Sequence, residues 1–257
     1  MYNGIRILGK ERPDIPKSFC DFVRGIRFRY IKPQTPIIPI GFDRFSQRLK
    51  LGVKFEVFNT RFPRNGRRIK RLLRPVFYIP RMSTCAVGGI INEGVRQMPA
   101  GSAFVNVGVW KGYTLLSGMV GNEDKVCIGV DNFSEFGEQK DDFYENFEAY
   151  RSSQHHFCEM DYRDYFAQEH QQSIGFYIYD GEHSYQNQLK GLQTAEPFFA
   201  GGCIILIDDA NYDEVQQGTA DFIACSPHNY EVIFNQTTYC NSHPTFWNGI
   251  MILQRSS

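Results

Sequence analysis

Residues 175–211 contain two short apolar runs, and acidic residues follow each of them. Phe176 to Tyr179 precede Asp180-Gly181, and Cys203 to Ile207 precede Asp208-Asp209. Runs of this length, bounded by turn residues, are typical of buried strands, and the segment between them is long enough for a helix. The pattern predicts two parallel strands joined by a helix. Ligands of parallel sheets bind beyond the carboxyl ends of the strands, so these three acids are candidate site residues.

The same alternation of strands and helices extends over residues 83–254. Strands are predicted at 103–108, 126–131, 155–159, 175–180, 203–208, 230–236 and 246–254, and helices at 83–97, 112–121, 140–152, 162–171, 185–199 and 213–225. Such an alternation predicts a sheet with helices on both faces. No helix separates the last two strands, so we expect them to pair antiparallel. The predicted fold class is α/β, a doubly wound, Rossmann-like, seven-stranded and mostly parallel sheet with an antiparallel C-terminal strand.

Residues 1–80 differ from the rest of the chain in charge and in proline content. They hold 19 Lys and Arg against 5 Asp and Glu, whereas residues 81–257 hold 9 against 23, so the net charges are +14 and −14. Prolines at positions 13, 16, 33, 36, 39, 63 and 75 favour extended or turning segments. The recurring aromatic residues exceed what a disordered segment carries. We therefore expect a basic, partly ordered N-terminal arm (residues 1–80) packed on a main domain (residues 81–257).

The N-terminal arm contains a run, residues 59–75, with seven basic residues and no acid. Such a run can bind nucleic acid phosphates or anionic lipid by charge alone. We favour a solvated face instead, or a patch that docks on the acidic main domain or on a second subunit. We accordingly expect a homo-oligomer. A third interpretation is that Arg67, Arg68, Lys70 and Arg71 contact an anionic substrate.

The seven cysteines are scattered and include no C-x-x-C pair, which argues against a zinc site or a disulfide framework. Free thiols suit a reducing, cytoplasmic location, and charged residues interrupt any signal peptide at the N-terminus. No stretch approaches about 18 uncharged apolar residues, so we expect no transmembrane segment. The absence of G-x-S-x-G, P-loop and H-E-x-x-H motifs removes the commonest hydrolase and kinase classes.

The turn after the first strand of the main domain reads Gly108-Val-Trp-Lys-Gly112-Tyr-Thr114. A glycine here lets the backbone approach a ligand, and the next helix offers free N–H groups. Trp110 stands where a dinucleotide motif has its second glycine, so a pyrophosphate is disfavoured and a smaller nucleoside cofactor is allowed. The alternative is that Gly108 and Gly112 only form a tight turn.

Two further acids follow predicted strands. Asp131 lies 23 residues after Gly108, where an acidic residue commonly binds ribose hydroxyls, and its alternative role is a turn or cap. Asp161 is suited to accept a hydrogen bond from an adenine amino group, and its alternative role is the N-cap of the next helix. Solvated surface acids are not expected to follow strand after strand in this way.

The side chains of Asp180, Asp208 and Asp209 are expected to converge, because adjacent strands lie about 4.8 Å apart. Either a cation neutralises them or the pKa of at least one rises. We favour a cation, of the kind of Mg²⁺, Mn²⁺ or Ca²⁺, over a capping role for Asp209 and backbone contacts for Asp208. His183 is a candidate general base because its unperturbed pKa is near neutrality, and its alternative role is that of a turn residue.

The motifs V-G-V-W-K-G-Y-T, D-G-E-H-S-Y and I-D-D-A-N together resemble class I S-adenosylmethionine-dependent methyltransferases. The resemblance is to the macrocin O-methyltransferase-like branch, whose members act on small molecules, often sugars, and it covers roughly residues 83–254. It implies transfer of a methyl group from S-adenosyl-L-methionine to a hydroxyl of a small-molecule acceptor such as a sugar or glycoside. It also implies that Asp180, Asp208 and Asp209 bind Mg²⁺ and that His183 and Asp180 are the catalytic residues.

The resemblance further implies a set of cofactor contacts. The methionine end would contact Asn106, Gly108, Trp110, Gly112 and Thr114, the ribose Asp131, the adenine Asp161, and Asp180 would also lie against the cofactor. The family often has an acid where this chain has Asn106, and an amide does not neutralise an ammonium group. A second hypothesis, which we do not favour, is a catalytically silent methyltransferase-like module that binds nucleic acid or an anionic membrane through its N-terminal arm.

Overall fold

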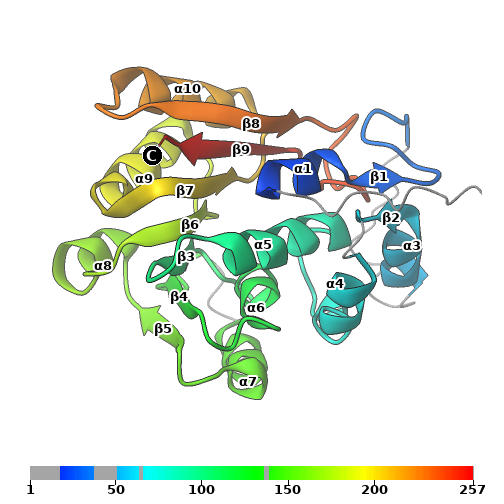
Figure 1. The fold of residues 1–257 in the computed structure, drawn as a ribbon, viewed down its shortest axis with the longest axis horizontal. Helices are drawn as coiled ribbons and strands as arrows, with labels where there is room; N and C mark the ends of the chain where they lie inside the picture. Colours follow the sequence, from blue (N-terminus) through cyan, green and yellow to red (C-terminus); the bar gives the residue numbers. More distant parts are fainter. Residues whose placement is uncertain (1–17, 38–50, 64–65, 136–138, 257) are drawn as a thin grey trace, which may run out of the picture.

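The computed structural model describes residues 18–37, 51–63, 66–135 and 139–256, and its centre is a seven-stranded sheet (Figure 1). The strands are β3 (Ala103–Val107), β4 (Val126–Asp131), β5 (His155–Glu159), β6 (Ile174–Tyr179), β7 (Phe199–Ile207), β8 (Tyr230–Gln236) and β9 (Ile250–Arg255). Their order is β5-β4-β3-β6-β7-β9-β8. The strands from β3 to β7 pair parallel, and β9 pairs antiparallel with both β7 and β8. The predicted fold class is therefore confirmed.

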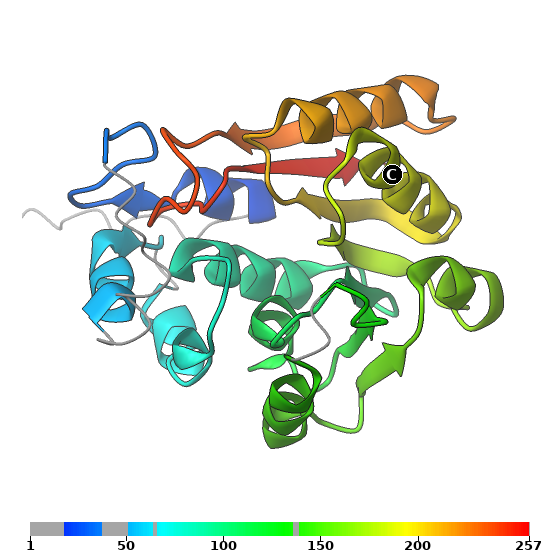
Figure 2. The ribbon, with the colours of Figure 1, turned by 180° about the vertical axis from the view of Figure 1, so that it is seen from behind.

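Helices cover both faces of this sheet (Figure 2). On one face lie α5 (Cys85–Gln97), α6 (Tyr113–Met119) and α7 (Lys140–Tyr150), and on the other α8 (Tyr162–Gln168), α9 (Tyr185–Ala195) and α10 (Asp213–Cys225), with η3 (Glu196–Phe198) between α9 and β7. Side chains of successive strand residues alternate between the two cores. Phe104 and Phe176 point into the first, and Val105 and Tyr177 into the second. The strands are apolar on both faces because helices cover both.

The strand order places the predicted site residues at one edge. Val107 of β3 is in register with Val130 of β4 and with Tyr179 of β6, so the residues that follow these strands lie side by side. The chain leaves β3 towards β4 and β5 and then returns to β6 on the other side of β3. A sheet whose order reverses in this way has a crevice at the reversal, beyond the carboxyl ends of the strands.

The N-terminal arm contributes short elements, and one of them enters the core. They are α1 (Phe19–Arg24), β1 (Arg27–Phe28), α3 (Leu51–Asn59), β2 (Thr60–Arg61), α4 (Gly66–Leu72) and the 3₁₀ helix η1 (Val76–Tyr78). Phe19 and Phe22 of α1 are buried in the same core as α5, and the ring of Phe19 meets the edge of Phe176 on β6 at 6.2 Å. Figure 1 shows α1 beside α5. The division of the chain at residue 80 stays a prediction.

Two segments of the N-terminal arm are more helical than its prolines indicate. The helix α3 contains no proline, and Pro63 and Pro75 flank α4 without interrupting it. Proline outside a helix leaves the hydrogen bonds of that helix intact. Residues 1–17, 38–50 and 64–65, which include part of the predicted basic run, lie outside the described residues. Within the described ranges, no helix combines the length and the apolar character that crossing a bilayer requires.

Candidate active site

The turn after β3 joins three strand ends. Gly108 adopts φ +78°, and a Cβ atom at this position would lie 2.0 Å from the backbone oxygen of Asp180. Its N–H donates to the carbonyl oxygen of Val130 at 2.9 Å. Only glycine combines this left-handed backbone with such a close approach. Gly108 therefore allows the chain to pass directly against the residue that follows β6.

Asp131, at the end of β4, fixes the same turn with its side chain. One carboxylate oxygen accepts hydrogen bonds from the N–H groups of Val109 and Trp110, at 2.8 and 3.3 Å. The other accepts from the N–H of Phe133 at 2.7 Å. The turn role considered from the sequence is thus present. The two lone pairs of Oδ2 are thus both used, whereas Oδ1 keeps one, so Asp131 is still able to accept from a ligand hydroxyl.

Asn106 is fully buried on β3, next to this turn. Its Nδ2 donates to the carbonyl oxygens of Val107 and Gly108, at 3.2 and 2.8 Å. Its Oδ1 has no hydrogen-bond partner among the described residues. An unsatisfied buried acceptor costs on the order of 1–3 kcal/mol, so a donor group supplied by a ligand would stabilise it.

A cavity of about 210 Å³ opens at this edge of the sheet. Of the residues predicted from the sequence, those that line it are Gly108, Trp110, Asp131, Asp161 and Asp180. The lining among the described residues does not include the other predicted residues, Asn106, Gly112, Thr114, His183, Asp208 and Asp209. Gly112 adopts φ +96° at the start of α6, and Thr114 is buried within that helix, so both have structural roles.

Several residues that line the cavity were not predicted. Half of them are apolar or aromatic, and these include Met82, Phe133, Met160, Tyr162 and Tyr179. Phe133 and Met160 are close neighbours of Asp131 and Asp161 in sequence, so strand ends are a signal that could have found them. The rings of Tyr162 and Tyr179 meet edge to face at 5.4 Å and give the cavity an aromatic wall. Residues 136–138, which follow the wall at 133–135, lie outside the described residues.

Asp161 is the N-cap of α8, the alternative role considered from the sequence. Its Oδ1 accepts from the N–H of Arg163 at 2.9 Å, and both of its oxygens pair with the Arg163 guanidinium. Hydrogen bonds from Arg163 lower the pKa of Asp161 more than its burial raises it. The carboxylate still lines the cavity, so capping and ligand contact are compatible here.

The acids that follow β6 and β7 lie around His183. Its Nε2 is 3.5 Å from an oxygen of Asp180 and 3.5 Å from an oxygen of Asp209. Asp209 adopts φ +56°, and its other oxygen accepts from Asn248 Nδ2 at 2.8 Å. Asp208 is 6 % exposed, and its Oδ1 has no partner among the described residues. The structure thus places Asp180, Asp209 and His183 together, with Asp208 beside them in sequence.

This arrangement shifts the pKa of each of its buried members. Burial by itself would lower the pKa of His183, but the hydrogen bond and charge of Asp180 and the charge of Asp209 raise it to about 9. Burial, followed by the charges of Asp180 and Asp209, raises the pKa of Asp208 well above its ordinary value. Burial also raises the pKa of Asp209. His183 is therefore an imidazolium at neutral pH, which differs from the near-neutral pKa expected from its residue type.

The side chains of the predicted metal ligands do not form a metal site in their present arrangement. Among the described residues, no three His, Cys, Asp or Glu side chains are arranged to hold one. The positive charge next to Asp180 and Asp209 is the His183 imidazolium, 3.5 Å from each. The carboxylates do converge, as expected, but a protonated side chain compensates two of them in this arrangement.

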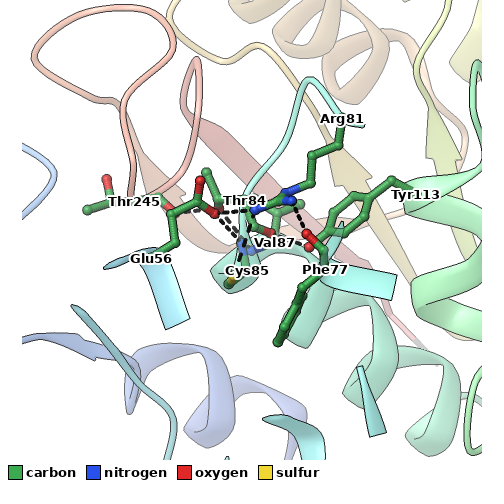
Figure 3. Close-up of polar contacts among 8 residues, drawn as sticks. All are labelled: Glu56, Phe77, Arg81, Thr84, Cys85, Val87, Tyr113 and Thr245. Carbon is green, nitrogen blue, oxygen red and sulfur yellow. Dashed lines mark hydrogen bonds and ion pairs between the residues drawn. The ribbon is translucent and has the colours of Figure 1, made fainter. Parts of the chain in front are cut away.

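Figure 3 shows a buried ion pair between Glu56 and Arg81, the residue that precedes Met82 in the sequence. Arg81 Nη2 lies 2.7 Å from Glu56 Oε2, and the same oxygen accepts from the N–H of Cys85 at 3.1 Å, at the start of α5. The Arg81 guanidinium also donates to the Phe77 carbonyl and lies over the ring of Tyr113, 4.9 Å from its centroid. Burial would lower the pKa of Arg81, but the charge of Glu56 raises it.

The ion pair connects the N-terminal arm to the candidate site. Glu56 comes from α3, and Tyr113 is the first residue of α6, directly after the glycine turn. The Tyr113 hydroxyl donates to the carbonyl of Thr84 at 2.8 Å, and the Thr84 hydroxyl donates to the carbonyl of Thr245 at 2.6 Å. Glu56 is the only acid in residues 44–92, and that isolation is a sequence signal for a buried pair.

Comparisons with known proteins agree with this architecture. Residues 105–210, from β3 to the end of the β7 turn, match the family model described as a methyltransferase domain. The sequence matches no curated protein. The matched segment contains the glycine turn and the acids that follow β4, β5, β6 and β7.

Solved structures share the fold at low sequence identity. The O-methyltransferase TomG from Streptomyces achromogenes is 12% identical with a TM-score of 0.51, and the alignment covers 81% of this chain and 96% of TomG. A proposed caffeoyl-CoA O-methyltransferase from Staphylococcus aureus is 11% identical with a TM-score of 0.52, covering 74% and 91%. A Corynebacterium glutamicum protein is 13% identical with a TM-score of 0.54, covering 74% and 89%.

These similarities bear differently on the sequence-based expectations. At such identities the solved structures show the fold alone, and the family model matches residues 105–210. Neither comparison identifies the macrocin O-methyltransferase-like branch. Residues 105–210 match the model of a methyltransferase domain, which agrees with the prediction of a methyltransferase.

Proposed function

We propose that the chain transfers a methyl group from S-adenosyl-L-methionine to a hydroxyl oxygen of a small molecule. The observation that carries the proposal is the cavity at the reversal of strand order, where Gly108, Asp131, Asp161 and Asp180 meet within a methyltransferase domain. The TomG structure, which has the same fold, was solved in complex with this cofactor. Sugars and glycosides are the acceptor class to test first, because the motifs resemble enzymes that act on them.

The residues around the cavity fit the cofactor in chemical terms. The remaining lone pair of Asp131 Oδ1 is suited to accept from a ribose hydroxyl, and the unpaired Oδ1 of Asn106, which is buried beside the glycine turn and does not line the cavity, would accept from the ammonium group only if the cofactor reached it. Asp161 and the wall of Tyr162 and Tyr179 offer an acceptor and aromatic surface to adenine. S-adenosylmethionine, when bound, supplies a methyl group activated by a sulfonium.

His183 is the proposed proton acceptor, and Asp180 and Asp209 orient it. The acceptor hydroxyl must lose its proton as its oxygen gains the methyl group, and Nε2 of neutral His183 takes that proton next to Asp180, which lines the cavity. The two carboxylates stabilise the resulting imidazolium. Assistance by Mg²⁺ bound to Asp180, Asp208 and Asp209 stays a prediction, and no step is routed through a metal.

Methyl transfer can be measured with S-adenosylmethionine that carries a labelled methyl group and a panel of sugars, glycosides and phenols. Each acceptor is tested with Mg²⁺ and with a chelator. We expect label in one hydroxyl-bearing class and loss of turnover in His183→Gln. Equal turnover in chelator would remove the metal from the proposal, and absence of label from every acceptor together with absence of cofactor binding would contradict the function.

A further inference from the structure

A second cavity lies between α3, α4 and η1, in the N-terminal arm. Its volume is about 340 Å³, and it shares no described lining residue with the first cavity. Small-molecule sites commonly occupy about 300–1,000 Å³, so this cavity is large enough for one. Neither the family match at 105–210 nor the proposed methyl transfer involves it.

Every charged residue that lines this second cavity among the described residues is basic. The four are Arg29, Lys54, Lys70 and Arg74. None of them forms an ion pair with a described acid. The nearest acid in sequence, Glu56, is already bound to Arg81 and to the N–H of Cys85. No acid among the described residues therefore compensates the positive charge of the cavity.

The positive charge of Lys70 is unfavourable in free energy because the side chain of Lys70 is half-buried. Its Nζ donates to the carbonyl oxygens of Val57 and Thr60, which holds the ammonium group inside the arm. Burial, and then the charge of Arg29, lower the pKa of Lys70. A cation that is buried and faces like charges is stabilised by an anion nearby.

The other residues that line the second cavity are apolar or aromatic, and some of them are exposed. Val57 and Phe77 are two of the less exposed ones. Phe58 and Tyr78 also line the cavity and are 51 % and 43 % exposed. The Arg29 guanidinium lies over the ring of Phe58, 4.5 Å from its centroid. Basic and aromatic groups thus occur side by side, a composition that suits a ligand with a charged end and an apolar body.

We propose that the second cavity binds a small amphiphilic anion. Its phosphate or carboxylate would lie against Arg29, Lys54, Lys70 and Arg74, and its apolar body against Phe58, Phe77 and Tyr78. The basic residues of the lining require a negatively charged ligand. The aromatic residues require that the ligand also has an apolar body. The proposal is independent of methyl transfer, since no residue of the first cavity takes part.

Calorimetric titration of the full chain with octyl phosphate tests the proposal. We expect saturable binding of one molecule per chain that weakens as salt is added. Charge reversal of two exposed rim residues, Lys54→Glu and Arg74→Glu, should each weaken binding by about tenfold or more, the usual scale for a lost charge-assisted contact. Lys190→Glu on α9 is the matched control, because Lys190 is an exposed lysine far from this cavity in the fold, and it should leave affinity unchanged.

Further ligands test the charged contact and the apolar contact separately. Octanoate should compete with octyl phosphate, whereas octanol and inorganic phosphate should not compete at the same concentrations. Phe58→Ala should weaken binding of octyl phosphate. The proposal is overturned if octyl phosphate does not bind, if the Lys54→Glu/Arg74→Glu variant binds it as well as the wild type, or if inorganic phosphate binds equally well. Binding to vesicles of anionic phospholipid without binding of monomeric octyl phosphate would indicate a membrane-docking surface and would also overturn it.

Discussion

His183 is the residue whose charge most affects the candidate site. The carboxylates of Asp180 and Asp209 hold it as an imidazolium with a pKa of about 9, so its neutral form is a minor species at pH 7. Neutral His183 therefore binds a proton strongly, but only a small fraction of the molecules carry it in that form at pH 7. Because its folded-state pKa is raised above 6.5, protonated His183 stabilises the fold fully below about pH 6.5, and this stabilisation is lost as the pH rises through about 9.

The pH dependence of methyl transfer follows from the same shift. With neutral His183 as base, the rate at saturating cofactor should rise about tenfold per pH unit and level off near the pKa of about 9. His183→Gln should flatten this profile and lower the maximal rate by roughly 10²- to 10⁴-fold. The control is His156→Gln, since His156 is exposed on β5. An unchanged profile in His183→Gln would assign the proton transfer to another group.

Gly108 provides a test of the close approach between β3 and β6. Gly108→Ala adds a Cβ 2.0 Å from the Asp180 backbone oxygen, whereas Gly101→Ala, at nearly the same φ, meets no atom within 4 Å. Both variants incur backbone strain of about 1–2 kcal/mol. Gly108→Ala should cost about 1–3 kcal/mol more in the free energy of unfolding, because only it forces atoms apart. Equal losses in denaturant titrations would show that the clash is relieved without cost.

At the scale of elements, the Glu56–Arg81 pair attaches α3 to the start of α5. Glu56→Gln leaves a buried guanidinium without its counter-charge, and removal of one partner of a buried pair costs about 3–5 kcal/mol. The double variant Glu56→Gln/Arg81→Met should lose less than the sum of the single variants, by about 0.5–3 kcal/mol. Urea unfolding measures the free energy of unfolding of the two single variants and of the double variant.

A surface pair supplies the control for that experiment. Glu148 and Arg151 pair at 3.0 Å with side chains that are 59% and 49% exposed, so Glu148→Gln should change stability by no more than about 0.5 kcal/mol. Additive losses for Glu56 and Arg81 would mean that the two side chains act independently, contrary to the geometry in Figure 3.

The elements of the main domain were predictable, and those of the N-terminal arm were not. The strands β3, β4, β6 and β7 are largely apolar runs that end at or before a turn residue or an acid, so local pattern and tertiary position agree there. In the N-terminal arm, α1 is a helix because Ser18 caps it and the core buries Phe19 and Phe22. The packing of α1 on α5 depends on contacts between residues far apart in sequence. The local periodicity of apolar residues does not indicate such contacts.

The site was predictable to the extent that strand ends determine it. Asp131, Asp161 and Asp180 line one cavity because the carboxyl ends of parallel strands share an edge. Gly112 and Thr114 were expected there and do not line this cavity: Gly112 precedes α6 with a left-handed backbone, and Thr114 is buried within that helix. The raised pKa of His183 depends on Asp209, 26 positions away, and on burial, neither of which is visible in the residues next to it.

At the scale of the whole molecule, the described chain shares continuous packing from α1 to β9. Phe22 is fully buried in the core that also contains α5 and β6. Phe22→Ala should therefore lower the free energy of unfolding of the whole chain by about 3–5 kcal/mol in one cooperative transition. Phe58→Ala, in the same arm but 51 % exposed, should have little effect. Two separate transitions in calorimetry, with only one moved by Phe22→Ala, would show that the arm folds apart from the main domain.

The most direct test of the account is a calorimetric titration of the full chain with S-adenosyl-L-methionine. The wild type and the exposed-site control Asp124→Asn should bind one cofactor with the same affinity, and Asp131→Asn, which removes a charge at the cavity, should bind it at least about tenfold more weakly. Failure of the folded wild type to bind, or equal affinity in Asp131→Asn, would contradict a cofactor site at this edge of the sheet.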